Sequence, residues 1–138
     1  MIDAFVADSS VGIGWVHPGQ ATELTEQLLE AAKGGSLVHV PSLWHLEIAN
    51  GLLVAVRRKL MTDAHRQTGL ALLNQLRLMV DEETSRRAFS TISDLAGKHM
   101  LSVYDAAYLE LAGRFALPFG SRDEPLRKAA QKCGIEVL

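Results

Sequence analysis

Short β-like hydrophobic runs alternate along the chain with longer stretches whose apolar residues recur at helical spacing. The predicted strands are 5–7, 37–40, 77–80, 117–119 and 135–138. The predicted helices are 21–33, 43–60, 62–76, 85–99, 102–115 and 125–132. After the first strand come Ser9, Ser10, Gly12 and Gly14, and these small residues predict a turn. Strands separated by helices predict parallel pairing through right-handed crossovers, and therefore a sheet covered by helices on both faces.

The composition indicates one globular domain spanning residues 1–138. Hydrophobic residues make up 48% and charged residues 22% of the chain, which argues against the disordered and fibrous classes. The apolar run 52–56 is far shorter than the roughly 20 residues of a membrane span. The single cysteine, Cys133, cannot form an internal disulfide, and the N-terminus lacks the positive region of a secretory signal. We therefore expect no membrane segment and a cytoplasmic location.

The net charge counts mildly against nucleic acid as a partner. Its formal value is −2 at pH 7, whereas proteins that bind nucleic acid by bulk electrostatics usually carry a clearly basic balance. Acidic residues gathered around divalent cations would have their charge cancelled locally. The net charge is therefore compatible with an acidic metal site inside a basic rim.

Aspartates stand where predicted strands end or predicted helices begin. Asp8 directly follows the first strand, Asp123 follows the run 117–119, and Asp105 lies three residues after Ser102. Each of these positions is also explained by helix capping, for which Asp and Ser are favoured. Ligands of open α/β sheets, however, bind beyond the carboxyl ends of the strands. The aspartates are therefore candidate site residues.

Glu47 differs from the aspartates because it sits a full turn inside its predicted helix, where no cap explains it. Burying an ionised carboxylate destabilises a fold by roughly several kcal/mol unless the group is paired, hydrogen-bonded or metal-bound. The open alternatives are a buried ion pair, a protonated glutamate and a metal ligand. The helical stripe that Glu47 shares, and that we expect to face inward, contains Leu43, Leu46, Asn50, Leu53 and Val54.

Acidic residues that meet at one edge of a sheet point to a divalent cation. Mg²⁺ and Mn²⁺ prefer carboxylate oxygens, and either ion would relieve the repulsion between crowded carboxylates. A bound divalent ion can also activate water for attack on a phosphodiester.

The segments around these acids resemble the PIN-domain family. The family places an Asp after the first strand, a Glu in a central helix, an Asp at the start of a late helix and an Asp near a final strand-to-helix turn. The most specific match is the helical pattern Asp-Ala-x-Tyr-x-x-Leu-Ala, and Ser121 stands where the family commonly has Thr. The matching segments are 5–10 (FVADSS), 46–50 (LEIAN), 104–112 (YDAAYLELA) and 121–126 (SRDEPL).

This resemblance implies a three-layer α/β/α PIN-like fold with a parallel five-stranded sheet. It also implies RNA hydrolysis by water activated on Mg²⁺ or Mn²⁺, and a homodimer, which we expect to form through the middle helices near 52–76. The residues it assigns to metal binding and catalysis are Asp8, Glu47, Asp105 and Asp123, with Glu124 as an alternative fourth acid. The candidate substrate or antitoxin contacts are Ser9, Ser121 and Arg122. A lone domain of this size resembles a VapC-type toxin, inhibited by a cognate VapB-like antitoxin whose C-terminal segment occupies the cleft.

Two other functions remain open. A catalytically silent PIN-like module would bind RNA or protein without cleaving it, and acids that point apart, or an ion pair between Glu47 and Arg122, would indicate it. A phosphoacceptor receiver domain would need a Lys after a late strand, whereas 120–122 reads Gly-Ser-Arg.

Several other residues have both a structural and a functional interpretation. The basic run 57–59 could follow an RNA backbone, although charge at a helix end is usually solvated. Arg122 could reach phosphate, although pairing with a site carboxylate is its expected role. Trp15 and Trp44 could stack on bases, although core packing or a dimer interface is more common. The histidines and Cys133 lack the spacing of a zinc site.

Overall fold

The computed structural model describes residues 2–138, and in these residues four strands alternate with helices as the hydrophobic pattern predicts. The strands are β1 (Ala4–Ala7), β2 (Leu37–Pro41), β3 (Leu78–Asp81) and β4 (Phe119–Gly120). They form one sheet in the order β3-β2-β1-β4, and every pair is parallel. The central position of β1 places the residue that follows it, Asp8, in the middle of the sheet's carboxyl edge.

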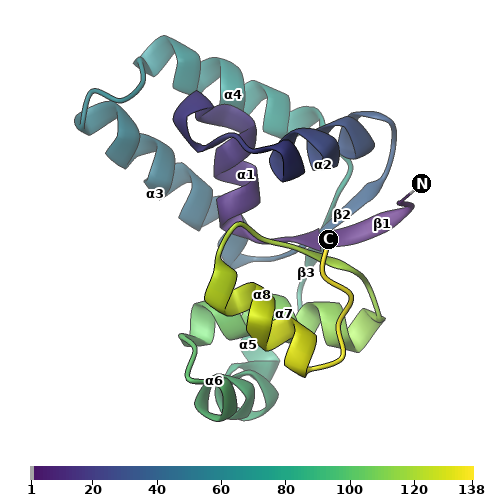
Figure 1. Cartoon of the computed structure of the whole chain (residues 1–138). Helices are drawn as coiled ribbons and strands as arrows, with labels where there is room; N and C mark the ends of the chain where they lie inside the picture. Colours follow the sequence, from purple (N-terminus) through teal and green to yellow (C-terminus); the bar gives the residue numbers. More distant parts are fainter. Residues whose placement is uncertain (1) are drawn as a thin grey trace.

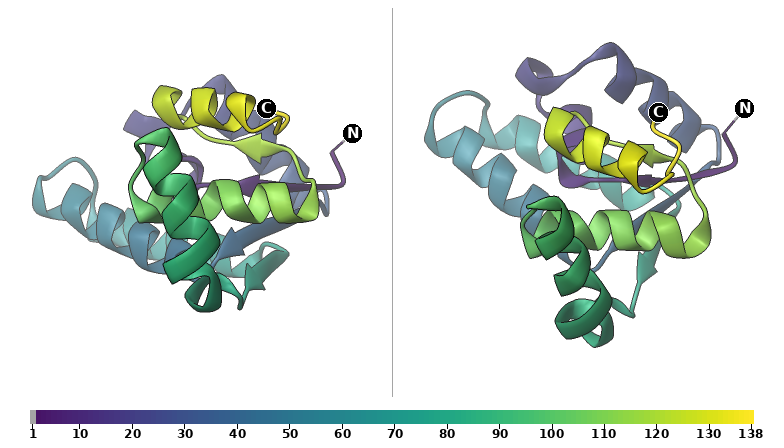
Figure 2. Two further views of the ribbon diagram at one scale, coloured as in Figure 1. Left: turned by 90° about the horizontal axis from the view of Figure 1, so that it is seen from below. Right: turned by 60° about the horizontal axis from the view of Figure 1, so that its bottom comes forward.

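Helices cover both faces of the sheet. The segments are α1 (Ser9–Val16), η1 (Pro18–Gln20), α2 (Glu23–Lys33), α3 (Leu43–Arg57), α4 (Asp63–Gln75), α5 (Thr84–Arg87), η2 (Ala88–Ile92), α6 (Ser93–His99), α7 (Val103–Phe115) and α8 (Glu124–Lys132). Figure 1 shows α1 to α4 on one side of the sheet and α5 to α8 on the other. The turned views in Figure 2 show the same three layers, with α7 and α8 side by side. The predicted α/β/α architecture is confirmed.

The core lies between these layers and includes both tryptophans. Trp44 and Trp15 are 1% and 7% exposed, and their ring centroids lie 6.4 Å apart. Phe5 and Phe119 of the sheet are fully buried, because each face of a parallel sheet is covered. The two tryptophans are therefore core residues and are not available to stack on bases.

The segment after β1 is a helix, and the predicted turn is wrong. Asp8 caps α1, and the glycines inside it allow close approach of neighbouring helices instead of bending the chain. A Cβ on Gly12 would clash with Ile48 Cδ1 and lie 2.8 Å from Trp44 Cζ2. A Cβ on Gly14 would lie 2.7 Å from a methyl carbon of Thr25.

The expected five-stranded sheet is also corrected, because the described residues form four strands. Residues 135–138 make a single parallel bridge, between Phe119 and Val137. Its hydrogen bonds run from Phe119 N to Glu136 O (2.8 Å) and from Leu138 N to Phe119 O (2.9 Å). The neighbouring strand β4 is two residues long, so it offers too little backbone for a further strand to pair with.

The buried face of α3 differs from the predicted stripe. Its buried residues are Trp44, Ile48, Leu52 and Ala55, whereas Leu46 is 75% exposed and Asn50 is also exposed. Apolar residues occur around much of this helix, so their spacing alone did not select one face. Glu47 is consequently half-buried at the border of the core rather than inside it.

The predicted helix 85–99 is formed from α5, the π-helical turn η2 and α6. Within residues 2–138, no helix is long and apolar enough to cross a membrane.

Candidate functional site

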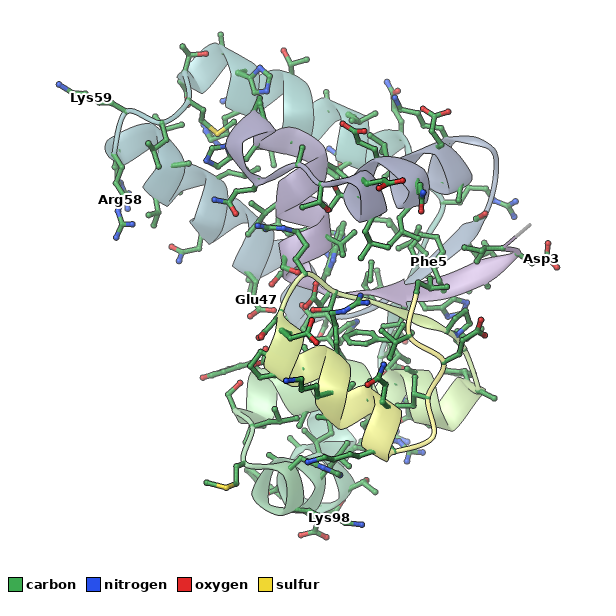
Figure 3. All side chains as sticks on the ribbon, viewed as in Figure 1. Asp3, Phe5, Glu47, Arg58, Lys59 and Lys98 are labelled. Atoms are coloured by element: carbon green, nitrogen blue, oxygen red, sulfur yellow. The ribbon has the colours of Figure 1, made fainter. Side chains whose placement is uncertain are left out.

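The acidic residues named from the sequence come from different elements that meet at the carboxyl edge of the sheet. Asp8 follows β1, Glu47 lies in the second turn of α3, Asp105 lies in the first turn of α7, and Asp123 precedes α8. Figure 3 shows Glu47 at this edge, near the beginnings of α7 and α8. Arg58 and Lys59 lie at the opposite end of α3, so the basic run 57–59 is not beside the acids.

Asp8 is a helix cap and a buried site carboxylate at the same time. Its side chain is almost inaccessible to solvent, at 5% exposure. One oxygen, Oδ1, accepts from the Ser10 hydroxyl (2.6 Å) and from the Val11 backbone N–H (3.2 Å). The other, Oδ2, accepts from the Ser121 hydroxyl at 2.5 Å. The capping and functional interpretations of this residue are therefore compatible.

Two serine hydroxyls connect Asp8 to the loop that carries Asp123. The Ser121 hydroxyl oxygen accepts from the Asp123 backbone N–H at 3.0 Å, and the Ser10 hydroxyl oxygen accepts from the Arg122 N–H at 2.9 Å. Each serine thus donates to Asp8 and accepts from the loop. The hydroxyl of Ser121 therefore makes the link between Asp8 and the backbone of Asp123.

Glu47 is hydrogen-bonded to a tyrosine and is not paired with a basic side chain among residues 2–138. The Tyr108 hydroxyl donates to Glu47 Oε1 at 2.5 Å. Burial and the neighbouring Glu47 charge raise the pKa of Tyr108, which keeps the phenol protonated as a donor. The Ser9 hydroxyl also favours the ionised Glu47 and lowers its pKa. In the part of the chain that the structure describes, no ion pair joins Glu47 to Arg122.

The four acids interact through their charges. Burial raises the pKa of Asp8, Glu47 and Asp105. The Asp105 charge raises the pKa of both Asp8 and Glu47, and the Asp123 charge raises that of Asp105. Hydrogen bonds from serines and from Tyr108 oppose these rises. Burial is the larger cause of each raised pKa, and the like charge of a neighbouring acid adds to it.

Asp123 and Glu124, adjacent in sequence, have different surroundings. The Glu124 side chain is 66% exposed and pairs with Arg127, with its Oε2 atom 3.6 Å from Nε. The Asp123 side chain accepts no capping hydrogen bond from α8, and its charge acts on Asp105. The geometry thus favours Asp123 as the fourth acid.

Arg122 does not pair with a site carboxylate, so its expected structural role is wrong. Its Nη1 donates to Ser10 O at 3.3 Å and its Nη2 donates to the side-chain oxygen of Gln20. Its Nε is buried and has no hydrogen-bond partner in residues 2–138. The side chain therefore contacts α1 and η1 and no carboxylate of the site.

Sequence reasoning gave no role to Ser10 or Tyr108. Tyr108 was visible within the family-like motif, because the helical spacing places it close to a carboxylate at the start of the helix. Ser10 carried no comparable signal, since its partners are set by the position of a loop more than a hundred residues away.

The donor chemistry of the site fits a hard divalent cation. The four acids supply carboxylate oxygens, which Mg²⁺ and Mn²⁺ prefer, and burial and crowding raise the pKa of three of them. Within residues 2–138, no three His, Cys, Asp or Glu side chains already have the arrangement of a formed metal site.

Comparisons with known proteins show the fold. Neither protein-family models nor curated protein sequences match the chain. The crystal structure of PAE2754 from Pyrobaculum aerophilum is similar with a TM-score of 0.70 and 16% identity, over 99% of this chain and 83% of that one. The crystal structure of FitAcB from Neisseria gonorrhoeae is similar with a TM-score of 0.60 and 19% identity, over 97% of this chain and 96% of that one.

Proposed function

We propose that this protein is a metal-dependent endoribonuclease of the PIN-domain type that acts as a toxin and is inhibited by a cognate VapB-like antitoxin. One observation carries the proposal: Asp8, Glu47, Asp105 and Asp123 come from four separate segments that meet at the carboxyl edge of the sheet. Ser121 joins two of these segments, because it donates to Asp8 and accepts from the Asp123 N–H. Carboxylates crowded at the carboxyl edge of a parallel sheet lower the stability of the fold, and carboxylates with shifted pKa values are common at functional sites. The sequence resemblance to PIN domains supplies the reaction class.

The carboxylates Asp8, Glu47, Asp105 and Asp123 would hold Mg²⁺ or Mn²⁺. Such an ion supplies Lewis-acid chemistry and activates water for attack on a phosphodiester. The other polar residues keep the carboxylates in place. Ser10 and Ser121 fix both oxygens of Asp8, and Tyr108 fixes Glu47.

The proposed partners follow from the same resemblance. They are an RNA substrate, an antitoxin whose C-terminal segment occupies the cleft, and a second copy of the chain. Leu52 and Leu73 are buried in the chain's own core, whereas Leu60, at the tip between α3 and α4, is 61% exposed. A dimer through the middle helices would therefore use exposed positions such as Leu60, and a monomeric mass at micromolar concentration would contradict it.

A cleavage assay tests the proposed activity. Purified protein is incubated with a mixed RNA pool in Mg²⁺, in Mn²⁺ and in EDTA, together with the variants Asp8→Asn and Asp105→Asn. Either substitution should reduce cleavage more than about a hundredfold, beyond the roughly 10–100-fold cost of losing an outer-shell partner of a metal site. Glu124→Gln is the matched control, because Glu124 is exposed and paired with Arg127, and it should retain activity.

A second candidate is a catalytically silent PIN-like module that binds RNA or protein. It is favoured by the lack, within residues 2–138, of three acids already arranged as a metal site. A folded wild-type protein that binds Mn²⁺ but cleaves no RNA would support this module and contradict the nuclease.

A further inference from the structure

One aromatic side chain next to the acidic site is open to solvent. Tyr104 directly precedes Asp105 in the first turn of α7, and it is 65% exposed. Large aromatic residues are usually buried or paired, so an exposed one beside a candidate active site needs an explanation. The tryptophans, which the sequence offered as stacking candidates, are both in the core.

The position of Tyr104 in α7 places it at the mouth of the site. It lies four residues before Tyr108, and residues at this spacing share one side of a helix. The Tyr108 hydroxyl contacts Glu47 at 2.5 Å. Tyr104 is therefore about one helical turn further out than the residue that holds Glu47, while its neighbour Asp105 interacts with the other acids.

Exposed apolar residues occur in the segments that carry Tyr104 and Glu47. Met100 is 93% exposed and Val103 is 44% exposed in the segment that leads into α7, and Leu46, next to Glu47 in α3, is 75% exposed. The segments 43–50 and 100–105 contain no Lys or Arg. The cationic Arg122 comes from the loop before α8 and contacts α1. Beside the acids Glu47 and Asp105, this flank of the site therefore offers apolar contact area and no basic side chain.

A ligand that contacts this flank must present an apolar face. In RNA that face is a nucleobase, and only an unpaired base can lay its whole face on an aromatic ring. Stacking of this kind tolerates any sequence, because every base has a π-face. It also suits a chain of net charge −2, which cannot rely on bulk attraction to phosphates.

We propose that Tyr104 is a base-stacking residue that holds an unpaired nucleobase next to the scissile phosphate. The inference rests on the proposed ribonuclease function. It adds a residue that positions the substrate beside the acidic site.

The binding experiment uses a single-stranded oligoribonucleotide that contains one 2-aminopurine, whose fluorescence is quenched when the base stacks. The protein carries Asp8→Asn so that the RNA is not cut. Tyr104→Ala should abolish the quenching and weaken binding about tenfold or more, which is the typical loss of one base–aromatic stack. Tyr104→Phe keeps the ring and should bind within about twofold of the parent.

Phe115→Ala is the matched control, and a duplex of the same sequence is the second one. Phe115 is 50% exposed at the other end of the same helix, about 16 Å away along the axis at the usual helical rise. Its substitution should leave quenching unchanged. Binding of the duplex should not depend on Tyr104, because its bases are already stacked on each other.

The cleavage assay, run with Tyr104→Ala alone, separates this inference from the proposed function. Equal quenching, affinity and cleavage in Tyr104→Ala and in its parent would overturn the stacking role and leave the nuclease intact. Quenching that depends on Tyr104 in a protein that cleaves no RNA would support stacking and contradict the nuclease. A wild-type protein that neither binds nor cleaves RNA would overturn both.

Discussion

Ser121 shows how a single hydroxyl contributes to this site. It is fully buried, donates to Asp8 Oδ2 at 2.5 Å and accepts from the Asp123 N–H at 3.0 Å. Ser121→Ala would leave a buried carboxylate oxygen and a backbone N–H without these partners. We expect the free energy of unfolding to fall by about 1–3 kcal/mol, measured as a lower urea midpoint at an unchanged slope. Ser121→Thr keeps the hydroxyl and should lose less, whereas equal losses would show that the hydroxyl is not what stabilises the loop.

At the scale of the element, the packing of α1 against α3 depends on Gly12, one of the small residues from which the sequence predicts a turn. A Cβ on Gly12 would clash with Ile48 Cδ1 and lie 2.8 Å from Trp44. Gly12→Ala should therefore overpack the contact with α3 and lower the free energy of unfolding by about 1–3 kcal/mol. A Cβ on Gly97 of α6 would have nothing within 4 Å of it. Gly97→Ala should therefore stabilise the protein by up to about 1 kcal/mol through helix propensity. Thermal unfolding of both variants is the test, and a stabilising Gly12→Ala would contradict the close packing.

At the scale of the whole molecule, the acidic site couples stability to pH and to divalent cations. The ordinary pKa values are 3.8 for Asp and 4.5 for Glu, and in the fold those of Asp8, Glu47 and Asp105 are raised. Between the ordinary and the raised values the folded protein binds more protons than the unfolded chain. These three groups therefore make the metal-free protein less stable as pH rises through that window. Asp81 acts in the opposite direction, because its pairing with Arg114 lowers its pKa.

A cation that binds these carboxylates should reverse this loss. We expect Mg²⁺ or Mn²⁺ to raise the Tm at neutral pH, by the equivalent of about 2.7 kcal/mol when the free ion is at 100 times its Kd. The increase should shrink under acidic conditions, where the same carboxylates are protonated. Calorimetry with and without metal over a pH series measures this effect, and Asp105→Asn is the variant in which it should be smallest. An increase that is independent of pH would place the cation elsewhere.

The sequence by itself determined the class of fold and the location of the candidate chemistry. Strand and helix periodicities differ, so local spacing identified four paired strands and most helices. The ends of strands and the beginnings of helices pointed to Asp8, Asp105 and Asp123 as candidate site residues, and a position inside a helix that no cap explains pointed to Glu47. Only the tertiary structure decided which face of α3 is buried, that α1 is a helix, and that 135–138 forms one bridge. It also decided the partners of the site. Ser121 and Asp8 are 113 residues apart and Tyr108 and Glu47 are 61 apart, and contacts at such separations follow from how whole elements pack, which no local pattern encodes.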